Sequence, residues 1–268
     1  MSLRINSNPA AVNAYRNLTS TNVGLGKSLE KLSSGFRINR AADDAAGLVK
    51  SESLRAEISG NKAAVRNAQD GISFVQTAEG ALNEVHSILQ RMRELAVDAA
   101  NTATTDGAAQ DAEYDELVAE LTAIGTRTKF AGKTVFSDYA TTALTFQIGA
   151  NAADTLSFGT DLRVNTAGAN GITDANLAGQ NLTTGASGAI AVIDNAIGDV
   201  STARSKLGAT QNRLEHVVNN LNVAVENLTA SESRIRDTDM AMEMANFTKH
   251  QILSQAGTAM LAQANAVP

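Results

Sequence analysis

Apolar residues recur at helical spacing near both ends of the chain. Asn8 followed by Pro9 is typical of a helix N-cap with proline at the first helical position. Steps of three, four and seven then connect Leu18, Leu25, Leu29, Leu32 and Phe36. Residues 238–268 carry a second apolar stripe, formed by Met240, Met244, Phe247, Leu253, Ala256, Met260 and Val267. Both patterns predict a terminal helix.

Two longer apolar stripes lie between these terminal segments along the chain. The first covers residues 48–100 and, if helical throughout, extends about 80 Å at roughly 1.5 Å per residue. The second runs from Ile193 to Ile235 in alternating steps of four and three. Such heptad spacing predicts long helices that pack along one another in a coiled coil or a slender bundle.

The middle of the chain has a different pattern. A shorter helix is marked by Tyr114, Leu117, Leu121 and Ile124. Apolar and polar residues then alternate over 144–148 and 156–158, and the residues 149–154 between them are typical of a hairpin turn. Residues 165–188 contain one Ile, two Leu and no aromatic residue, which predicts an exposed loop.

Two similar breaks, at 41–44 and 236–239, separate the terminal stripes from the long ones. We therefore predict two domains. One comprises 1–43 with 237–268, and the other comprises 44–236, with a β-hairpin region at about 129–164 and a variable exposed loop at 165–188. The expected fold class is mainly α. A pair of helices buries little area, so we expect the terminal pair to fold fully only against copies of itself.

Catalytic motifs are scarce. The chain has no Cys, which excludes disulfides, thiolate metal sites and a cysteine nucleophile. His86, His216 and His250 are far apart, and no H-E-x-x-H, G-x-x-x-x-G-K-[ST] or G-x-S-x-G motif is present. The sequence therefore predicts no enzyme activity, no catalytic residue, no cofactor and no metal.

Acidic pairs at the two breaks have two interpretations. Asp43 with Asp44, and Asp237 with Asp239, could be paired carboxylates of a catalytic site. Helix caps and first-turn acids explain them better, because carboxylates are favoured at helix N-termini.

The charge is unevenly distributed. The net charge is −6, and residues 1–40 carry six basic side chains against one acidic one, so the rest of the chain is strongly negative. A negative chain is a poor nucleic-acid binder, but the basic arm keeps open a membrane-active helix as an alternative. The longest apolar run, Ala189 to Ile193, is too short for a transmembrane helix or a signal-peptide core. We expect no membrane insertion and no cleaved signal peptide.

Long segments at both ends carry a family resemblance. Residues 1–18, 31–58 and 233–267 closely resemble the terminal regions of bacterial flagellin. The likeness continues through 89–97 (LQRMRELAV), 128–133 (TKFAGK) and 146–150 (FQIGA). The family more often has Asn at the position of Ala131. The resemblance implies a structural subunit of the flagellar filament for motility, in a short form with only the two inner domains. Its terminal helices would form the inner coiled-coil core, surrounded by a rod-shaped helical domain.

The resemblance also implies functional residues. We expect the inner packing of a helical homopolymer to come largely from Leu18, Leu25, Leu29, Leu32, Phe36, Leu253 and Met260. Many flagellins are recognised by vertebrate Toll-like receptor 5 through the segment that residues 89–97 resemble and a nearby acidic residue, and the candidate positions here are Arg91, Leu95 and Glu116. The stripe through Leu89, Met92 and Ala96 is expected to leave Arg91 and Leu95 off the core face. The alternative is that Leu95 widens the core stripe.

The remaining implied partners belong to flagellar export and assembly. They are an export chaperone, the cap protein and the hook–filament junction proteins, with export of the unfolded chain through the flagellar type III pathway to the cell exterior. A hook–filament junction protein is an alternative identity, because it shares flagellin-like ends. A flagellin with an inserted protease is a second alternative, which the missing H-E-x-x-H motif disfavours.

Overall fold

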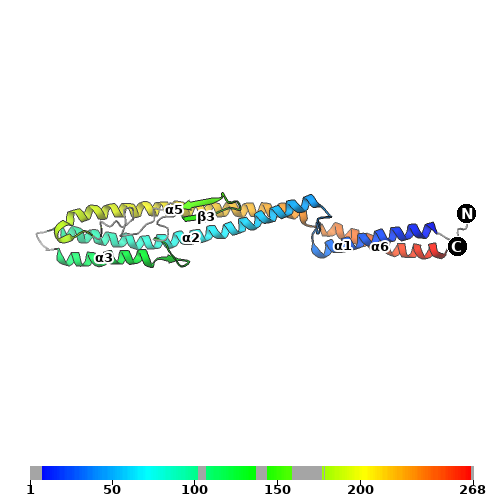
Figure 1. Ribbon diagram of the computed structural model, residues 1–268, viewed down its shortest axis with the longest axis horizontal. Helices are drawn as coiled ribbons and strands as arrows, with labels where there is room; N and C mark the ends of the chain where they lie inside the picture. Colours follow the sequence, from blue (N-terminus) through cyan, green and yellow to red (C-terminus); the bar gives the residue numbers. More distant parts are fainter. Residues whose placement is uncertain (1–7, 102–106, 137–143, 159–176, 178, 267–268) are drawn as a thin grey trace. The chain divides into compact units, whose positions relative to one another are not determined.

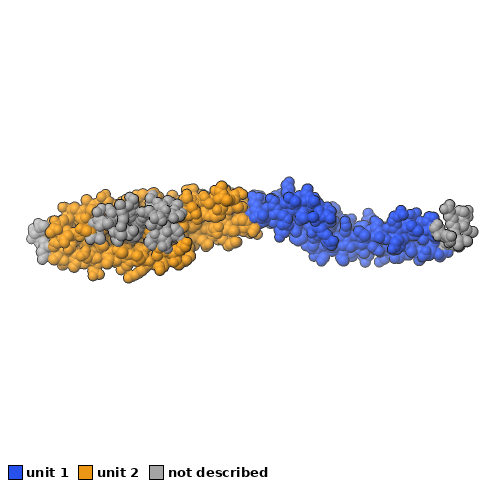
Figure 2. Space-filling model, viewed as in Figure 1, with its two compact units in different colours: residues 1–58, 226–268 blue, residues 59–225 orange. Residues whose placement is uncertain are grey.

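The structure is a computed structural model that describes residues 8–101, 107–136, 144–158, 177 and 179–266. The mainly α fold with long helices and small hairpins is confirmed (Figure 1). The chain divides into two compact units, and each is described here by itself. Unit 1 comprises Met1–Ile58 and Glu226–Pro268, and unit 2 comprises Ser59–Val225 (Figure 2).

Unit 1 is built on two antiparallel helices, α1 (Pro9–Ser34) and α6 (Met240–Ala266), which lie side by side (Figure 1). As predicted, Asn8 caps α1, and its side chain accepts hydrogen bonds from the backbone N–H groups of the next two alanines. The amide of Asn8 also donates to the carbonyl of Ala264, 2.9 Å away on α6. Further along the pair, Lys31 lies 3.8 Å from Glu243. The helix ends are therefore tied in register by polar contacts.

The segment that follows α1 is hydrogen-bonded to the segment that precedes α6. Gly35 ends α1 with φ +74°, a left-handed conformation that glycine adopts without steric cost. Its carbonyl accepts the N–H of Thr238 at 2.9 Å, and the N–H of Arg37 donates to the carbonyl of Arg236 at 2.6 Å. Between these bonds, Phe36 and Asp237 form an isolated antiparallel bridge. Residues 35–37 and 236–238, which are far apart in the sequence, are thus joined in one short antiparallel contact, which we call the clasp.

The clasp is covered by the side chain of Arg236. Its guanidinium lies 4.9 Å from the centre of the Phe36 ring and 2.8 Å from the carboxylate of Glu52. Glu52 belongs to the first turns of α2 (Ala45–Ala99), and Ser51 beside it is 3.4 Å from Glu232 near the end of α5 (Leu182–Arg236). These contacts join the first turns of α2 and the last turns of α5 within unit 1.

Two acidic residues of the breaks, Asp44 and Asp239, cap helix starts, as predicted. Asp44 accepts the N–H of Gly47 at 2.8 Å. Asp239 accepts the N–H groups of Ala241 and Met242 in the first turn of α6. Asp43 accepts the backbone N–H of Arg40, and this hydrogen bond holds the pKa of its carboxyl below the usual value. The carboxylates therefore stabilise turns and helix starts.

Unit 2 is a bundle in which α3 (Ala108–Arg127) packs with the parts of α2 and α5 that this unit contains. The ion pairs Arg93–Asp194 at 2.7 Å and Glu79–Arg204 at 3.9 Å show that α2 and α5 run antiparallel. The predicted stripes face the centre, and the largest fully buried side chains of the three helices are Leu82, Leu89, Met92, Tyr114, Leu121, Leu182, Ile193, Leu207 and Leu214.

Two hairpins lie against this bundle. Strands β1 (Lys129–Phe130) and β2 (Lys133–Thr134) are joined by a turn in which Ala131 has φ +49° and Gly132 has φ +83°. Strands β3 (Leu144–Gln147) and β4 (Thr155–Phe158) pair with Phe146 opposite Leu156, which confirms the predicted hairpin and its turn. The Phe74 ring of α2 meets the rings of Phe130 and Phe146 edge-on, at 5.7 and 6.1 Å between centroids.

The predicted loop at 165–188 is wrong for its last part. Residues 165–176 and 178 lie outside the described residues, but α5 begins at Leu182 and is kinked at Gly185. Leu177 and Leu182 are buried in the core, and the hydroxyl of Tyr114 donates to the carbonyl of Leu177 at 3.1 Å. Asp111 on α3 accepts the N–H of Leu182 at 2.6 Å. Two leucines are too few to predict a core segment from the sequence. The structure buries both, because α2, α3 and α5 provide the rest of the core around them.

Candidate assembly surface

Large apolar side chains are exposed almost entirely on unit 1. Among the described residues, the only such side chains on unit 2 are Val97 and Val223. Those on unit 1 are Val12, Tyr15, Val23, Leu29, Phe36, Val49, Met240, Met242, Met244, Ile252, Leu253 and Met260, which we call the apolar surface of unit 1. This uneven distribution makes unit 1 the candidate site where another macromolecule binds.

Small and polar residues occupy part of the contact between α1 and α6, and the large apolar side chains of the two helices face solvent. A Cβ atom at Gly24 would lie 2.7 Å from the His250 ring, and one at Gly257 would lie 3.2 Å from the Leu18 side chain. Ser28 is buried in the same seam. The close approach of the two helices therefore uses positions with little apolar volume. Ile38 is the one apolar residue of unit 1 that is buried in the described part of the chain.

The residues predicted to form the polymerisation core fall into two groups. Leu18, Leu25 and Leu32 are half-buried between α1 and α6. The exposed group consists of Leu29, Phe36, Leu253 and Met260. The second group has the larger apolar area available to another chain, with exposed fractions from 37% at Phe36 to 65% at Met260.

Several exposed apolar residues were absent from that prediction. Val12, Tyr15 and Val23 lie on α1, and Met242 and Ile252 lie on α6. The first three follow steps of three and eight, which put them on one side of a helix. This second, weaker stripe was a detectable signal in the sequence, and it runs beside the stripe that starts at Leu18.

The candidate receptor-binding residues are on unit 2, and the expectation that Leu95 lies off the core face is wrong. Leu95 is only 4% exposed and belongs to the core, because α2 faces both α3 and α5 and its buried side is wider than one seam. Arg91 is exposed and pairs with Glu113 at 2.8 Å and Glu94 at 3.3 Å, and these partners raise the pKa of its guanidinium. Glu116 is exposed on α3, three residues after Glu113.

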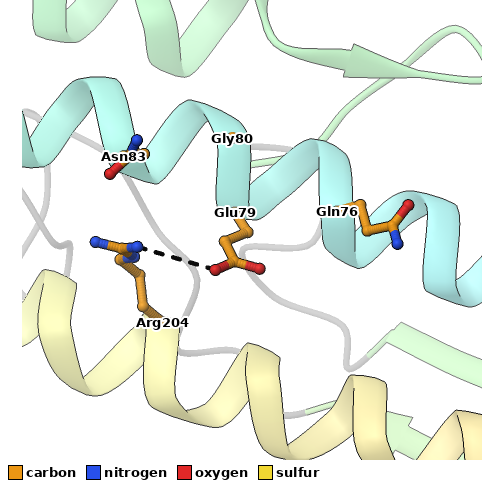
Figure 3. A pocket seen from close by; sticks show the side chains of 5 residues that line it. All are labelled: Gln76, Glu79, Gly80, Asn83 and Arg204. Carbon is orange, nitrogen blue, oxygen red and sulfur yellow. Dashed lines mark ion pairs between the residues drawn. The ribbon is translucent and has the colours of Figure 1, made fainter.

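A shallow depression on unit 2 lies between α2 and α5 (Figure 3). It has a volume of about 320 Å³ and is lined by Gln76, Glu79, Gly80, Asn83 and Arg204. Figure 3 shows the Arg204 guanidinium turned toward the Glu79 carboxylate, and the two are 3.9 Å apart. The lining offers amides and one ion pair, and it contains no nucleophile with an adjacent base.

The described residues contain neither a metal-binding cluster nor a helix suited to crossing a bilayer. There, His, Asp and Glu side chains form no group of three or more that could hold a metal ion. No helix within the described ranges combines the length and apolar character needed to cross a bilayer.

The chain is similar to known proteins over nearly its whole length. The model of the bacterial flagellin N-terminal helical region matches residues 5–141, and that of the flagellin C-terminal helical region matches residues 190–268. The chain is 50% identical to a flagellin of Bacillus subtilis, over 99% of this chain and 97% of the relative. It is 51% identical to a flagellin of Halalkalibacterium halodurans, over 98% and 96% of the two chains. A flagellar filament 33 kDa core protein of Treponema phagedenis is 44% identical, over 97% and 96%. The chain therefore belongs to the bacterial flagellin family, the structural subunits of the flagellar filament.

Proposed function

We propose that this chain polymerises into the flagellar filament through the apolar surface of unit 1, and that it has no enzyme activity. The observation that carries the proposal is the concentration of exposed large apolar side chains on α1 and α6. A filament requires a heterologous contact, in which one surface binds a different surface of the next copy. α1 and α6 present different residues to solvent, so each can meet the other helix of a neighbouring copy.

The energetics of the surface favour assembly. Full burial of a Leu, Ile, Val, Phe or Met side chain contributes about 1.5–3 kcal/mol. Association costs about 4–15 kcal/mol in lost translational and rotational freedom. The burial of several members of the apolar surface in each subunit would offset that cost.

The test places charge on the apolar surface of the full chain. A Leu29→Asp, Leu253→Asp variant should form no filaments under electron microscopy, because each carboxylate would be buried without a partner. The matched control is Val97→Asp, Val223→Asp, which adds the same charge to exposed positions of unit 2. Far-UV circular dichroism should show the same helix content in both variants. Normal filaments from the unit 1 variant would contradict the proposal.

Two further measurements bear on the same proposal. A chain that lacks residues 1–40 should also fail to polymerise while it keeps most of its helical signal.

Purified wild-type chains should grow long filaments, and short or absent polymers would favour the alternative of a hook–filament junction protein.

For export, we propose the partners that flagellins use: a chaperone, the flagellar type III pathway, the cap protein at the growing tip and the junction proteins at the hook. Support comes from family membership. The assembled protein would lie outside the cell, without nucleic-acid binding or membrane insertion. In cells without the flagellar export apparatus, the chain should accumulate in the cytoplasm.

A second candidate function is recognition by Toll-like receptor 5, through Arg91 and Glu116. Both side chains are exposed, and they lie on α2 and α3, which the Arg91–Glu113 ion pair joins. An Arg91→Ala variant should activate the receptor less than the wild type in a cell reporter assay, and Glu116→Ala should act in the same direction. Arg93→Ala is the matched control, because Arg93 is equally exposed but pairs with Asp194 on α5. Equal activation by wild type and the Arg91 variant would remove Arg91 from the receptor site.

A further inference from the structure

Four methionines are concentrated on the apolar surface of unit 1. The chain contains six Met residues. Met240, Met242, Met244 and Met260, all on α6, are between 47% and 65% exposed. Met92, on α2 in the core of unit 2, is fully buried. The molecule therefore carries accessible thioethers on its candidate assembly surface and a protected thioether elsewhere.

Local structure keeps the methionines exposed near the start of α6. Glu243 lies among three of them, and its side chain turns toward Lys31 on α1, where it is only 12% exposed. Met242 and Met244, the neighbours of Glu243 in the sequence, therefore project away from the seam. Asp239 caps this turn through backbone N–H groups, so the helix start does not depend on the methionine side chains.

An exposed thioether reacts with a peroxide. The sulfur attacks one oxygen of hydrogen peroxide, an S–O bond forms and the O–O bond breaks. The sulfur loses two electrons, and the second peroxide oxygen leaves as water after a proton transfer. The product, methionine sulfoxide, is polar, and a reductase can convert it back to methionine.

We propose that Met240, Met242, Met244 and Met260 form an oxidation-sensitive site that controls assembly. Hydrogen peroxide oxidises them in the free chain, and the apolar surface of unit 1 then carries polar S–O groups. Their burial in the filament leaves acceptors without donors, so the oxidised chain does not add to a polymer. The inference rests on the proposed function, because it requires that this surface is the one buried on assembly.

The test uses the full-length chain with hydrogen peroxide as the probe. Free chains are treated, the peroxide is destroyed with catalase, and oxidation at each methionine is measured by peptide mass spectrometry. We expect sulfoxide at the four α6 methionines and unmodified Met92. The critical concentration for polymerisation, measured by sedimentation, should rise by at least about tenfold. Treatment with both methionine sulfoxide reductases, MsrA and MsrB, which each reduce one sulfoxide epimer, should restore polymerisation.

Two variants make the result specific. A Met240→Leu, Met242→Leu, Met244→Leu, Met260→Leu chain keeps the apolar character and should polymerise equally well before and after peroxide treatment. Met92→Leu is the matched control and should remain as sensitive as the wild type. The reductase measurement on wild-type protein stands by itself if the fourfold variant polymerises poorly.

The outcomes separate this inference from the proposed function. Unimpaired polymerisation of wild-type chains with all four α6 methionines oxidised would overturn the inference, and so would equal peroxide inhibition of the fourfold leucine variant. Untreated wild-type chains that fail to polymerise would instead contradict the proposed function. In preformed filaments, the four methionines should oxidise more slowly than in free chains, and equal rates would contradict their burial.

Discussion

Both units are built from long antiparallel helices, but they bury their apolar residues differently. In unit 2, α2, α3 and α5 enclose Leu89 and Leu207, which are fully buried. In unit 1, α1 and α6 leave Leu29 57% exposed and Leu253 44% exposed. Three helices can surround a line of side chains, whereas two helices can cover only one face of each other. We infer that unit 2 is stabilised within one chain and that unit 1 depends on other copies of the chain.

Matched leucine substitutions test this comparison most strongly. Leu89→Ala should destabilise the soluble chain by about 2–5 kcal/mol, because it removes buried methyl groups and leaves a cavity. Leu29→Ala should change the free energy of unfolding by less than about 0.5 kcal/mol, since the side chain is already exposed. Urea unfolding followed by circular dichroism measures both changes. Similar losses from the two variants would mean that unit 1 has a closed core in the free chain.

A smaller effect is expected from the buried hydroxyl of Tyr114, whose only described acceptor is the carbonyl of Leu177. Tyr114→Phe removes this hydrogen bond, while the carbonyl still accepts the N–H of Gln180 at 3.4 Å, and should cost about 0.5–1.5 kcal/mol of unfolding free energy. Tyr15→Phe, at an exposed position of unit 1, is the control and should cost less than about 0.5 kcal/mol.

The same residue predicts a pH dependence for unit 2. Burial raises the pKa of Tyr114 above its ordinary value of 10.0. Above that pH the unfolded chain loses the proton first, so the folded state binds more protons and stability falls as the pH rises. The contribution of Tyr114 is fully present below about pH 10. Unfolding free energies measured between neutral and strongly alkaline pH should fall less steeply in Tyr114→Phe than in the wild type.

Two glycines of α1 provide a test of whether unit 1 is ordered in the free chain. Gly35 has φ +74°, so Gly35→Ala should destabilise the end of α1 by about 1–2 kcal/mol. Gly26 is inside the helix with open space around it, and Gly26→Ala should stabilise α1 by about 0.5–1 kcal/mol. Hydrogen exchange of the α1 amide groups should report both shifts. No change from either variant would show that α1 is unfolded before assembly.

The smallest expected effect concerns the β1–β2 turn of unit 2. Ala131 has φ +49°, a conformation that Gly adopts without steric cost and that Asn tolerates better than Ala does. Ala131→Asn should stabilise unit 2 by up to about 1 kcal/mol in thermal unfolding. Ala131→Val should have the opposite effect, because a β-branched residue disfavours positive φ. A gain from Val would contradict the assignment of strain to this turn.

Local patterns predicted most of the secondary structure correctly. The Asn8–Pro9 pair predicted the start of α1, and the heptad stripes predicted α2 and most of α5. The alternation around residues 149–154 predicted the β3–β4 hairpin. These features depend on residues a few positions apart, so a single sequence contains the information.

The errors arose where distant segments meet. Leu95 was placed off the core face because one seam was assumed for α2, and the structure has α3 on one side and α5 on another. Leu177 and Leu182 were assigned to a loop, because their partners Tyr114 and Asp111 are more than sixty residues away along the chain. Neither contact has a periodic signature in the sequence.

The sequence by itself determined the helix positions, the caps, the breaks, the lack of catalytic motifs and the family resemblance. Each of these follows from local hydrogen bonding, side-chain periodicity or residue identity. Only the tertiary structure decided which apolar side chains face a partner helix and which face solvent. That choice depends on how closely α1 and α6 approach, at positions such as Gly24 and Gly257, and on the number of helices that surround each stripe. The exposed methionines of α6 and the buried Met92 differ for this reason alone.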